Sequence, residues 1–251
     1  MSDHASEQHW ETSIYPFIIS VGILFLIPLA FAFQFVYKMP MLAVFSFGIG
    51  VILTVYGVAG WVGEAVSVKT EVGLTPVAMP WFILAEAFIF IGFFAAYWVT
   101  RITYDGNWPP PGTPAHMPIL VPIIMTVILL ASSVTIHVAE TKLEKGDNSG
   151  FMSWLIITII LGIFFLGFSA KEWSNLFGEG FYPKTNIYAT SFFSITGFHA
   201  SHVLVGICAF IAVALAAAKG KIHHTFTKSA SIYWHFVDII WFFVVTQIYF
   251  W

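Results

Sequence analysis

The sequence predicts an all-α integral membrane protein with seven transmembrane helices, and three observations lead to that class. Hydrophobic residues make up 59% of the 251 residues and charged residues only 9%, against roughly 25% charged residues in a typical soluble domain. The mean hydropathy is +0.86. Apolar runs of the ~20 residues that a helix needs to cross the hydrocarbon layer recur along the whole chain. A soluble globular domain is therefore excluded.

The expected helices follow one another with short joins that contain polar, glycine or proline residues. They lie near residues 15–37, 41–66, 77–104, 117–140, 150–173, 187–217 and 230–251. Residues 1–14 are expected to form a short cytoplasmic segment, and 15–251 a single seven-helix transmembrane domain. None of the joins is long enough to hold a soluble domain.

The charged residues of the joins predict how the chain crosses the membrane. The first 14 residues carry acidic groups but no Lys or Arg, unlike a cleaved secretory signal, so we expect the first helix to be retained. Six lysines fall in joins on the N-terminal side, and four basic residues fall on the opposite side. The positive-inside rule then places the N-terminus in the cytoplasm or matrix and the C-terminus outside.

The second expected helix, 41–66, is rich in small residues. Because small residues let helix backbones approach closely in lipid, we expect its glycines to pack against another helix. They are Gly48, Gly50, Gly57, Gly60 and Gly63. Glu64, near the end of the same helix, is a candidate for helix fixing or lipid contact.

The third expected helix, 77–104, carries Glu86 with no charged residue within ten positions on either side. An ionisable group in hydrocarbon is costly, so each one is a functional hypothesis. Glu86 is either a carboxyl that exchanges protons or faces lipid, or a neutral acid that is hydrogen-bonded to a neighbouring helix. We favour the first interpretation.

The fourth and fifth expected helices each carry an ionisable pair near one end. His137 and Glu140 are three residues apart near the end of 117–140, and Lys171 precedes Glu172 near the end of 150–173. Long side chains near a helix end can extend to the membrane–water interface. Contact with lipid headgroups therefore explains the presence of these ionisable residues at least as well as catalysis does.

The last two expected helices carry the remaining ionisable pairs. His199 and His202 share one helix face, but two histidines supply only half of a typical zinc site, so hydrogen-bonded packing is preferred over metal binding. His235 and Asp238 are also three apart, a spacing at which the carboxylate can hold the imidazole in one tautomer. We expect this pair to fix the helices together or to relay protons.

Several function classes are excluded or disfavoured. A retinal pigment needs a lysine deep in the last helix, which has none, and a haem-copper catalytic core needs a larger set of histidines. The net charge of -3 includes no basic block for nucleic acid, and a single cysteine, Cys208, cannot form an internal disulfide. Absence of inverted broken helices disfavours a transporter.

Three segments together resemble subunit III of the haem-copper respiratory oxidases, the cytochrome c oxidase family. They are Tyr-Trp-His-Phe-Val-Asp-Ile-Ile-Trp at 233–241, Thr-Ser-Phe-Phe-Ser-Ile-Thr-Gly-Phe-His-Ala-Ser-His-Val-Leu-Val-Gly at 190–206, and the segment of Glu86 that continues with Phe-Ile-Gly-Phe-Phe. The chain departs from the family in the sequence around Glu64, where many members carry Trp-Trp-Arg-Asp, and in His199-Ala-Ser-His202, where His-Gly-x-His is more usual.

The resemblance implies an accessory subunit that is itself non-catalytic and binds no haem, copper or other metal. Such a subunit packs directly against catalytic subunit I, beside subunit II, in a proton-pumping oxidase that reduces oxygen to water. It supports proton uptake, stabilises the active site and binds structural phospholipid in a cleft between its first two helices and the other five. The resemblance implies a location in a bacterial plasma membrane or mitochondrial inner membrane, where respiratory supercomplexes also form.

The same resemblance assigns the polar residues to two roles. Glu86 is the carboxyl that faces the proton or lipid environment. The candidates for helix fixing or lipid contact are Glu64, His137, Glu140, Glu172, His199, His202, His235 and Asp238. Alternatives are subunit III of a quinol oxidase, a homologue associated with nitric oxide reductase, a transporter or proton channel, and a membrane metalloenzyme that uses His199 and His202.

Overall fold

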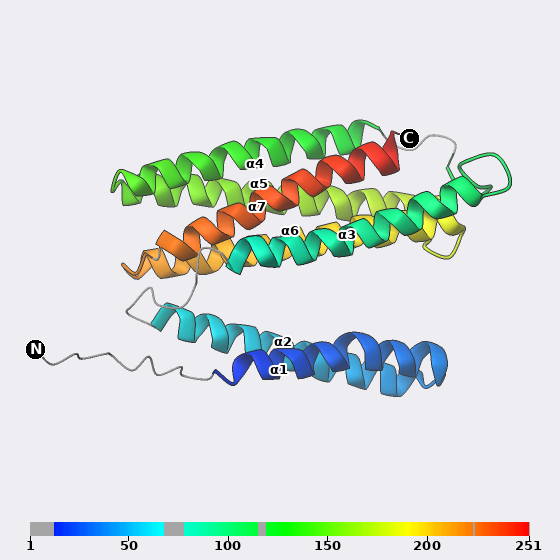
Figure 1. The fold of residues 1–251 in the computed structure, drawn as a ribbon, viewed down its shortest axis with the longest axis horizontal. Coiled ribbons are helices and arrows are strands. Elements are labelled where there is room, and N and C mark those ends of the chain that lie inside the picture. Colours follow the sequence, from blue (N-terminus) through cyan, green and yellow to red (C-terminus); the bar gives the residue numbers. More distant parts are fainter. Residues whose placement is uncertain (1–12, 68–77, 115–118, 223, 251) are drawn as a thin grey trace, which may run out of the picture. The chain divides into compact units, whose positions relative to one another are not determined.

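The computed structural model describes residues 13–67, 78–114, 119–222 and 224–250, without the side chains of 35, 65–67 and 78. These residues form seven helices long and apolar enough to span a membrane, which confirms the all-α membrane class (Figure 1). The chain divides into two compact units, Met1–Thr70 and Glu71–Trp251. The single seven-helix domain and the lipid-filled cleft stay predictions.

The first unit is a pair of helices. Helix α1 covers Tyr15–Leu24 and continues through two π-helical turns, Phe25–Leu29 and Ala32–Val36, before α2 covers Pro40–Ser67. The first π-helical turn contains Pro28, whose nitrogen has no hydrogen to donate to the preceding turn of an α-helix. Proline therefore accounts for the local widening of an otherwise continuous span.

Small residues bring α1 and α2 together. A Cβ added to Gly22 of α1 would lie 2.7 Å from the backbone nitrogen of Thr54 in α2, closer than real Cβ contacts allow. The predicted packing role is confirmed for the glycines of α2 that contact α1, which are Gly50, Gly57 and Gly60. For Gly48 and Gly63 it stays a prediction, since among the described residues a Cβ on either would meet nothing within 4 Å.

The second unit holds the other five helices. They are α3 (Ala78–Thr103), α4 (Leu120–Glu144), α5 (Asn148–Gly178), α6 (Ile187–Ala218) and α7 (His224–Val244), which ends in a π-helical turn at Val245–Tyr249. Helix α7 contacts α3, α4 and α6 and is the most buried of the seven spans. The core of this unit therefore lies around α7.

Large aromatic side chains fill that core. The fully buried ring of Trp234 lies against two glycines, because a Cβ on Gly162 of α5 or Gly206 of α6 would come within 2.9 or 2.6 Å of it. Two turns further along α7, the Trp241 ring meets Phe165 of α5 edge to face at 4.8 Å. Aromatic packing against small residues thus sets the spacing of α5, α6 and α7.

Helix ends differ from the expected ones by a few residues. Helix α7 begins at His224 rather than near residue 230, because its first turns are polar and hydropathy alone did not mark them as helix. Two of those polar residues, Thr227 and Ser229, are buried. Asp147 ends the α4–α5 turn, and its carboxylate accepts a hydrogen bond from the Gly150 backbone at 2.8 Å, capping α5.

Candidate functional site

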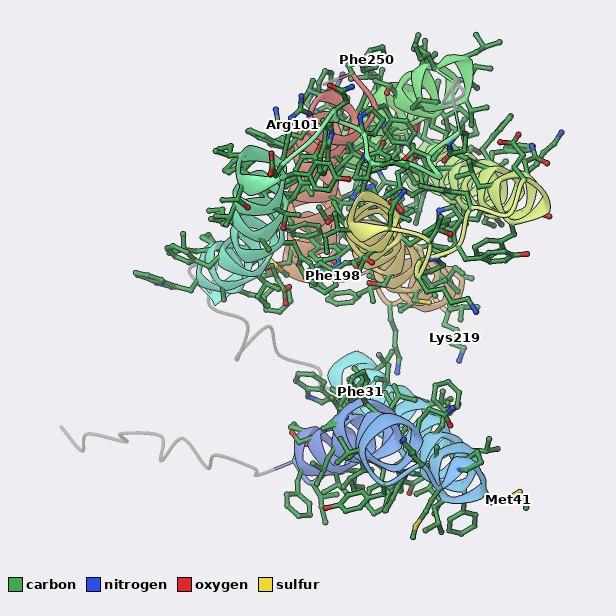
Figure 2. The ribbon with its side chains drawn as sticks, turned by 90° about the vertical axis from the view of Figure 1, so that its right-hand side faces the viewer. Phe31, Met41, Arg101, Phe198, Lys219 and Phe250 are labelled. Carbon is green, nitrogen blue, oxygen red and sulfur yellow. The ribbon has the colours of Figure 1, made fainter. Side chains whose placement is uncertain are left out.

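The buried ionisable residues of the second unit lie where its helices contact one another. Figure 2 shows side chains of the five helices crowded between their ribbons, with Phe198 labelled on α6. Among the described residues, the carboxyl groups of Glu86, Glu172 and Asp238 each belong to a separate hydrogen-bonded set, and His199 belongs to none. Each set joins two different helices.

The first set joins α3 to α6 through Glu86 and His202. The Nε2 atom of His202 lies 3.1 Å from Oε2 of Glu86, and Nδ1 lies 2.8 Å from the carbonyl oxygen of Phe198. A carbonyl can only accept, so Nδ1 carries a proton and donates it. The contact at Nε2 is then either a protonated Glu86 donating to a neutral imidazole or an imidazolium donating to a carboxylate. In both states the pair holds one proton that can lie on either residue.

Aromatic rings enclose most of this pair. The His202 ring lies 4.5 Å from the Phe198 ring and 5.0 Å from the Phe90 ring, measured between centroids. Tyr233 of α7 stacks at 6.3 Å and donates from its hydroxyl to the His202 carbonyl at 3.3 Å. The side chains of Glu86 and His202 are 19% and 10% exposed. Poor access of water strengthens the hydrogen bond between them.

His199 lies on α6 only one turn away, but it contacts different helices. Its ring is fully buried between Phe165 of α5, at 5.6 Å, and Trp241 of α7, at 5.1 Å. Neither ring nitrogen has a hydrogen-bond partner among the described residues. Because His202 faces Glu86 and His199 faces the aromatic core, the two imidazoles do not converge on one point.

The second set joins α4 to α7. The Ser133 hydroxyl donates to Oδ2 of Asp238 and accepts from Nδ1 of His235 at 3.1 Å. The sequence predicts that Asp238 contacts His235 directly and fixes its tautomer. Instead, Ser133 of α4 lies between them and fixes the tautomer of His235. Asp238 is buried, and its Oδ1 has no hydrogen-bond partner among the described residues.

The third set joins α5 to the C-terminal turn. The Tyr249 hydroxyl donates to Oε2 of Glu172 at 2.7 Å. Glu172 is only 3% exposed, whereas its neighbour Lys171 is exposed. Glu172 is therefore buried within the protein and hydrogen-bonded to the C-terminal turn.

The other predicted residues lie at the edges of these sets. His137 is exposed on α4, and Glu140 is half-buried within electrostatic range of Lys228 at the start of α7. Glu64 is exposed on α2, in the other unit. The described residues contain no group of three or more His, Cys, Asp or Glu that could hold a metal ion.

Sequence reasoning missed the hydroxyl partners Ser133, Tyr233 and Tyr249. Hydroxyl groups cost little in a membrane helix, so their presence there is no signal by itself. Tyr233 lies in a segment that resembles the oxidase family, but spacing along one helix cannot show a partner on another. Only the helix packing identifies them.

These features define a polytopic membrane protein whose ionisable groups join its own helices. A family model described as cytochrome c oxidase subunit III matches residues 8–251, nearly the whole chain. The chain therefore belongs to the cytochrome c oxidase subunit III family, as the resemblance predicted. It is consequently a subunit of an oxidase complex of respiratory membranes, with other oxidase subunits as partners.

Individual relatives agree with the family model. The chain is 38% identical over 169 residues to the probable cytochrome c oxidase subunit 3 of Mycobacterium tuberculosis (strain ATCC 25618 / H37Rv), covering 66% of this chain and 82% of that one. It is 37% identical over 172 residues to cytochrome c oxidase subunit 3 of Thermostichus vulcanus, with coverages of 67% and 83%. For the Rattus norvegicus protein the identity is 38% over 177 residues, with coverages of 68% and 67%.

Proposed function

We propose that this chain is a non-catalytic accessory subunit packed directly against catalytic subunit I, beside subunit II, of a proton-pumping terminal oxidase that reduces oxygen to water. The observation that carries the proposal is the family match over residues 8–251. The chain itself holds neither haem nor copper in this proposal. Its contribution is to support proton uptake, stabilise the active site and bind lipid.

The donor set of the described residues does not fit haem or copper, which supports the non-catalytic role. The Nδ1 atom of His202 donates to the Phe198 carbonyl and its Nε2 contacts Glu86. His199 is enclosed by two aromatic rings, and Nδ1 of His235 is engaged by Ser133. Ligation needs a free nitrogen aimed at a shared point, and these histidines face three different neighbours.

Glu86 and His202 are the proposed groups in the proton or lipid environment. The pair carries one proton between two atoms 3.1 Å apart, and it retains some exposure at the edge of α3 and α6. Because the Phe198 carbonyl keeps Nδ1 protonated, proton exchange at this edge takes place at Nε2 of His202 and the Glu86 carboxyl in this proposal. The remaining ionisable sets fix helices in this proposal.

Lipid binding and orientation complete the proposal. The division of the chain into two compact units agrees with the family arrangement, in which phospholipid fills a cleft between the first two helices and the other five. The N-terminus lies in the cytoplasm or matrix, and the six lysines of the joins on that side support this orientation. The membrane is a bacterial plasma membrane or a mitochondrial inner membrane.

The test is to purify the complex through a tag on this chain and to record reduced-minus-oxidised spectra. We expect haem absorbance and other oxidase subunits in the complex, and no haem absorbance in the chain after it is separated. Haem absorbance that stays with the isolated chain would contradict the accessory role. Solute or proton flux through the chain reconstituted alone would instead favour a transporter.

A further inference from the structure

Helices α4 and α7 carry matching rows of polar residues along their shared edge. On α4 the row is Ser133, His137, Glu140 and Glu144, and on α7 it is Lys228, Ser231, His235 and Asp238. Spacings of three and four residues place each row on one helix face. We name these eight residues the α4–α7 polar seam. The proposed function does not account for them as a group.

Contacts join the two rows into one surface. Ser133 meets His235 and Asp238 near the middle of both helices, while Glu140 lies within electrostatic range of Lys228 nearer the α4–α5 turn. Rising numbers on α4 thus meet falling numbers on α7, as expected for the antiparallel pair seen in Figure 1. The seam runs from the α4–α5 end to the middle of the span.

The seam is accessible from outside the unit. His137 is exposed, and Ser133, Glu140 and His235 are half-buried. Exposed apolar side chains flank it, including Val134 of α4 at 63% exposure and Ile239 of α7 at 58%. The surface therefore has a polar floor and an apolar rim, which suits another apolar helix that carries polar side chains.

Lipid tails cannot satisfy such a surface. His137 is exposed and Glu140 is half-buried, and a hydrocarbon chain offers neither of them a hydrogen-bond partner, a costly state in a membrane interior. By contrast, the outward face of α5 exposes isoleucines at 156, 160 and 163, which suit lipid tails. Among the described residues, the seam is also not a metal site.

We propose that the α4–α7 polar seam is the docking surface for a transmembrane helix of another oxidase subunit, one that presents hydrogen-bond donors. The accessible part of the seam holds two carboxyl groups, Glu140 and Glu144, and one lysine, Lys228, so the complementary partner carries hydroxyl, amide or basic groups on one face. Polar side chains join helices in lipid, where apolar surface gives no preference for protein over lipid. This inference rests on the proposed function and adds to it which face of this chain contacts another oxidase subunit.

Photo-crosslinking within the intact complex tests the location. The native thiol, Cys208, is exposed and is first removed by Cys208→Ala. A benzophenone maleimide is then attached to His137→Cys on the seam or to Ile156→Cys on α5, two exposed positions at similar distances from the α4–α5 turn. We expect a several-fold higher yield of adducts with another oxidase subunit from position 137. Equal yields, or adducts with lipid alone at position 137, would overturn the proposal.

Dissociation of the purified complex in detergent tests the chemistry. We expect His137→Leu or Glu144→Leu to release this chain about three- to tenfold faster than the wild type, the effect of losing one or two hydrogen bonds between membrane helices. His137→Gln, which keeps a donor, should release it more slowly than His137→Leu, and Ile156→Ala should match the wild type. The unfolding midpoint of each variant is measured as a control. A midpoint equal to that of the wild type shows that faster dissociation results from weaker docking and not from misfolding.

The outcomes also separate this inference from the proposed function. If no oxidase subunit copurifies with the wild-type chain, the proposed function fails. If oxidase subunits copurify but all the seam variants dissociate at the wild-type rate, only the seam proposal fails.

Discussion

The two units of the chain hold their helices together by different means. In the first unit, α1 and α2 approach over glycines, and the Ser46 hydroxyl donates to the Phe25 carbonyl at 2.8 Å. In the second unit, α3 to α7 pack around buried aromatic rings and carry the three hydrogen-bonded sets of ionisable residues. In the first unit, close approach of the backbones maximises van der Waals contact. The second unit adds hydrogen bonds between specific side chains of different helices.

This difference explains why the candidate functional residues gather in one unit. A pair of helices packed over glycines has little interior volume in which to bury an ionisable side chain. The five-helix unit encloses Glu86, Glu172 and Asp238 between helices and gives each a partner. The candidate groups for proton exchange and for docking therefore belong to the second unit. The first unit presents the outer surfaces of its two helices.

The largest expected effect is loss of the aromatic core by Trp234→Ala. The indole is fully buried, fills the space above Gly162 and Gly206, and donates from Nε1 to Ser132 at 2.9 Å. Its removal leaves a cavity, so the free energy of unfolding should fall by about 3–5 kcal/mol. Denaturant unfolding of the chain in detergent measures it.

The control for this change is Trp61→Ala on α2, where the ring is half-exposed and the cost should be much smaller. Equal losses for the two variants would contradict the central role of α7.

The next largest effect tests the packing of the first unit with Gly50→Ala. A Cβ there would overlap the backbone of Leu26, which cannot move without shifting α1. Overpacking of this kind should cost about 1–3 kcal/mol. Gly48→Ala is the matched control on the same helix, since its Cβ would meet nothing within 4 Å in the part of the chain that the structure describes. If both variants unfold at the same denaturant concentration, close approach does not hold this pair.

A third prediction separates the two properties of the pair formed by Glu86 and His202. Glu86→Ala leaves Nε2 of His202 unpaired and should cost about 1–3 kcal/mol of stability. Glu86→Gln keeps a donor for a neutral imidazole, so the stability should stay near that of the wild type, while the shared proton is lost.

Unfolding measurements check the first part of this prediction, and the pH profile and turnover lifetime of the oxidase complex check the second. A Gln variant with an unchanged profile and lifetime would reduce Glu86 to a packing role.

The smallest effect lies outside the membrane spans, at Asp147. The Gly150 backbone and Lys142, whose Nζ lies 3.1 Å from Oδ2, lower the pKa of the Asp147 carboxyl below its ordinary value. Stability from the ionised form is therefore complete above the ordinary pKa of about 4 and lost as the pH falls below it. The difference in unfolding midpoint between the wild type and Asp147→Ala should shrink as the pH falls from 7 to 3.

Asp147→Asn is the control for this last prediction, because it keeps an acceptor for the Gly150 backbone and removes the charge. Its unfolding midpoint should differ from that of Asp147→Ala by an amount independent of pH over this range. If the difference in unfolding midpoint between the wild type and Asp147→Ala does not change with pH, the pKa of Asp147 is not lowered as assigned.

Much of the architecture could be predicted from sequence because the membrane imposes it. Seven apolar runs become seven spans, since each backbone group in lipid must find its hydrogen bond within its own helix. Segments around Glu86, His202 and His235 also identified the family, which the whole-chain match confirms. The start of α7 was missed, because its polar first turns are buried by neighbouring helices that hydropathy does not consider.

The sequence by itself determined which residues are ionisable within the spans and which face of a helix each one shares. It placed His199 and His202 together, because three residues make nearly one helical turn. Only the tertiary structure decided that His202 meets Glu86, that His199 is enclosed by Phe165 and Trp241, and that Ser133 lies between His235 and Asp238. The physical reason is that periodicity acts within one helix, while a partner depends on which helices pack together and at what depth.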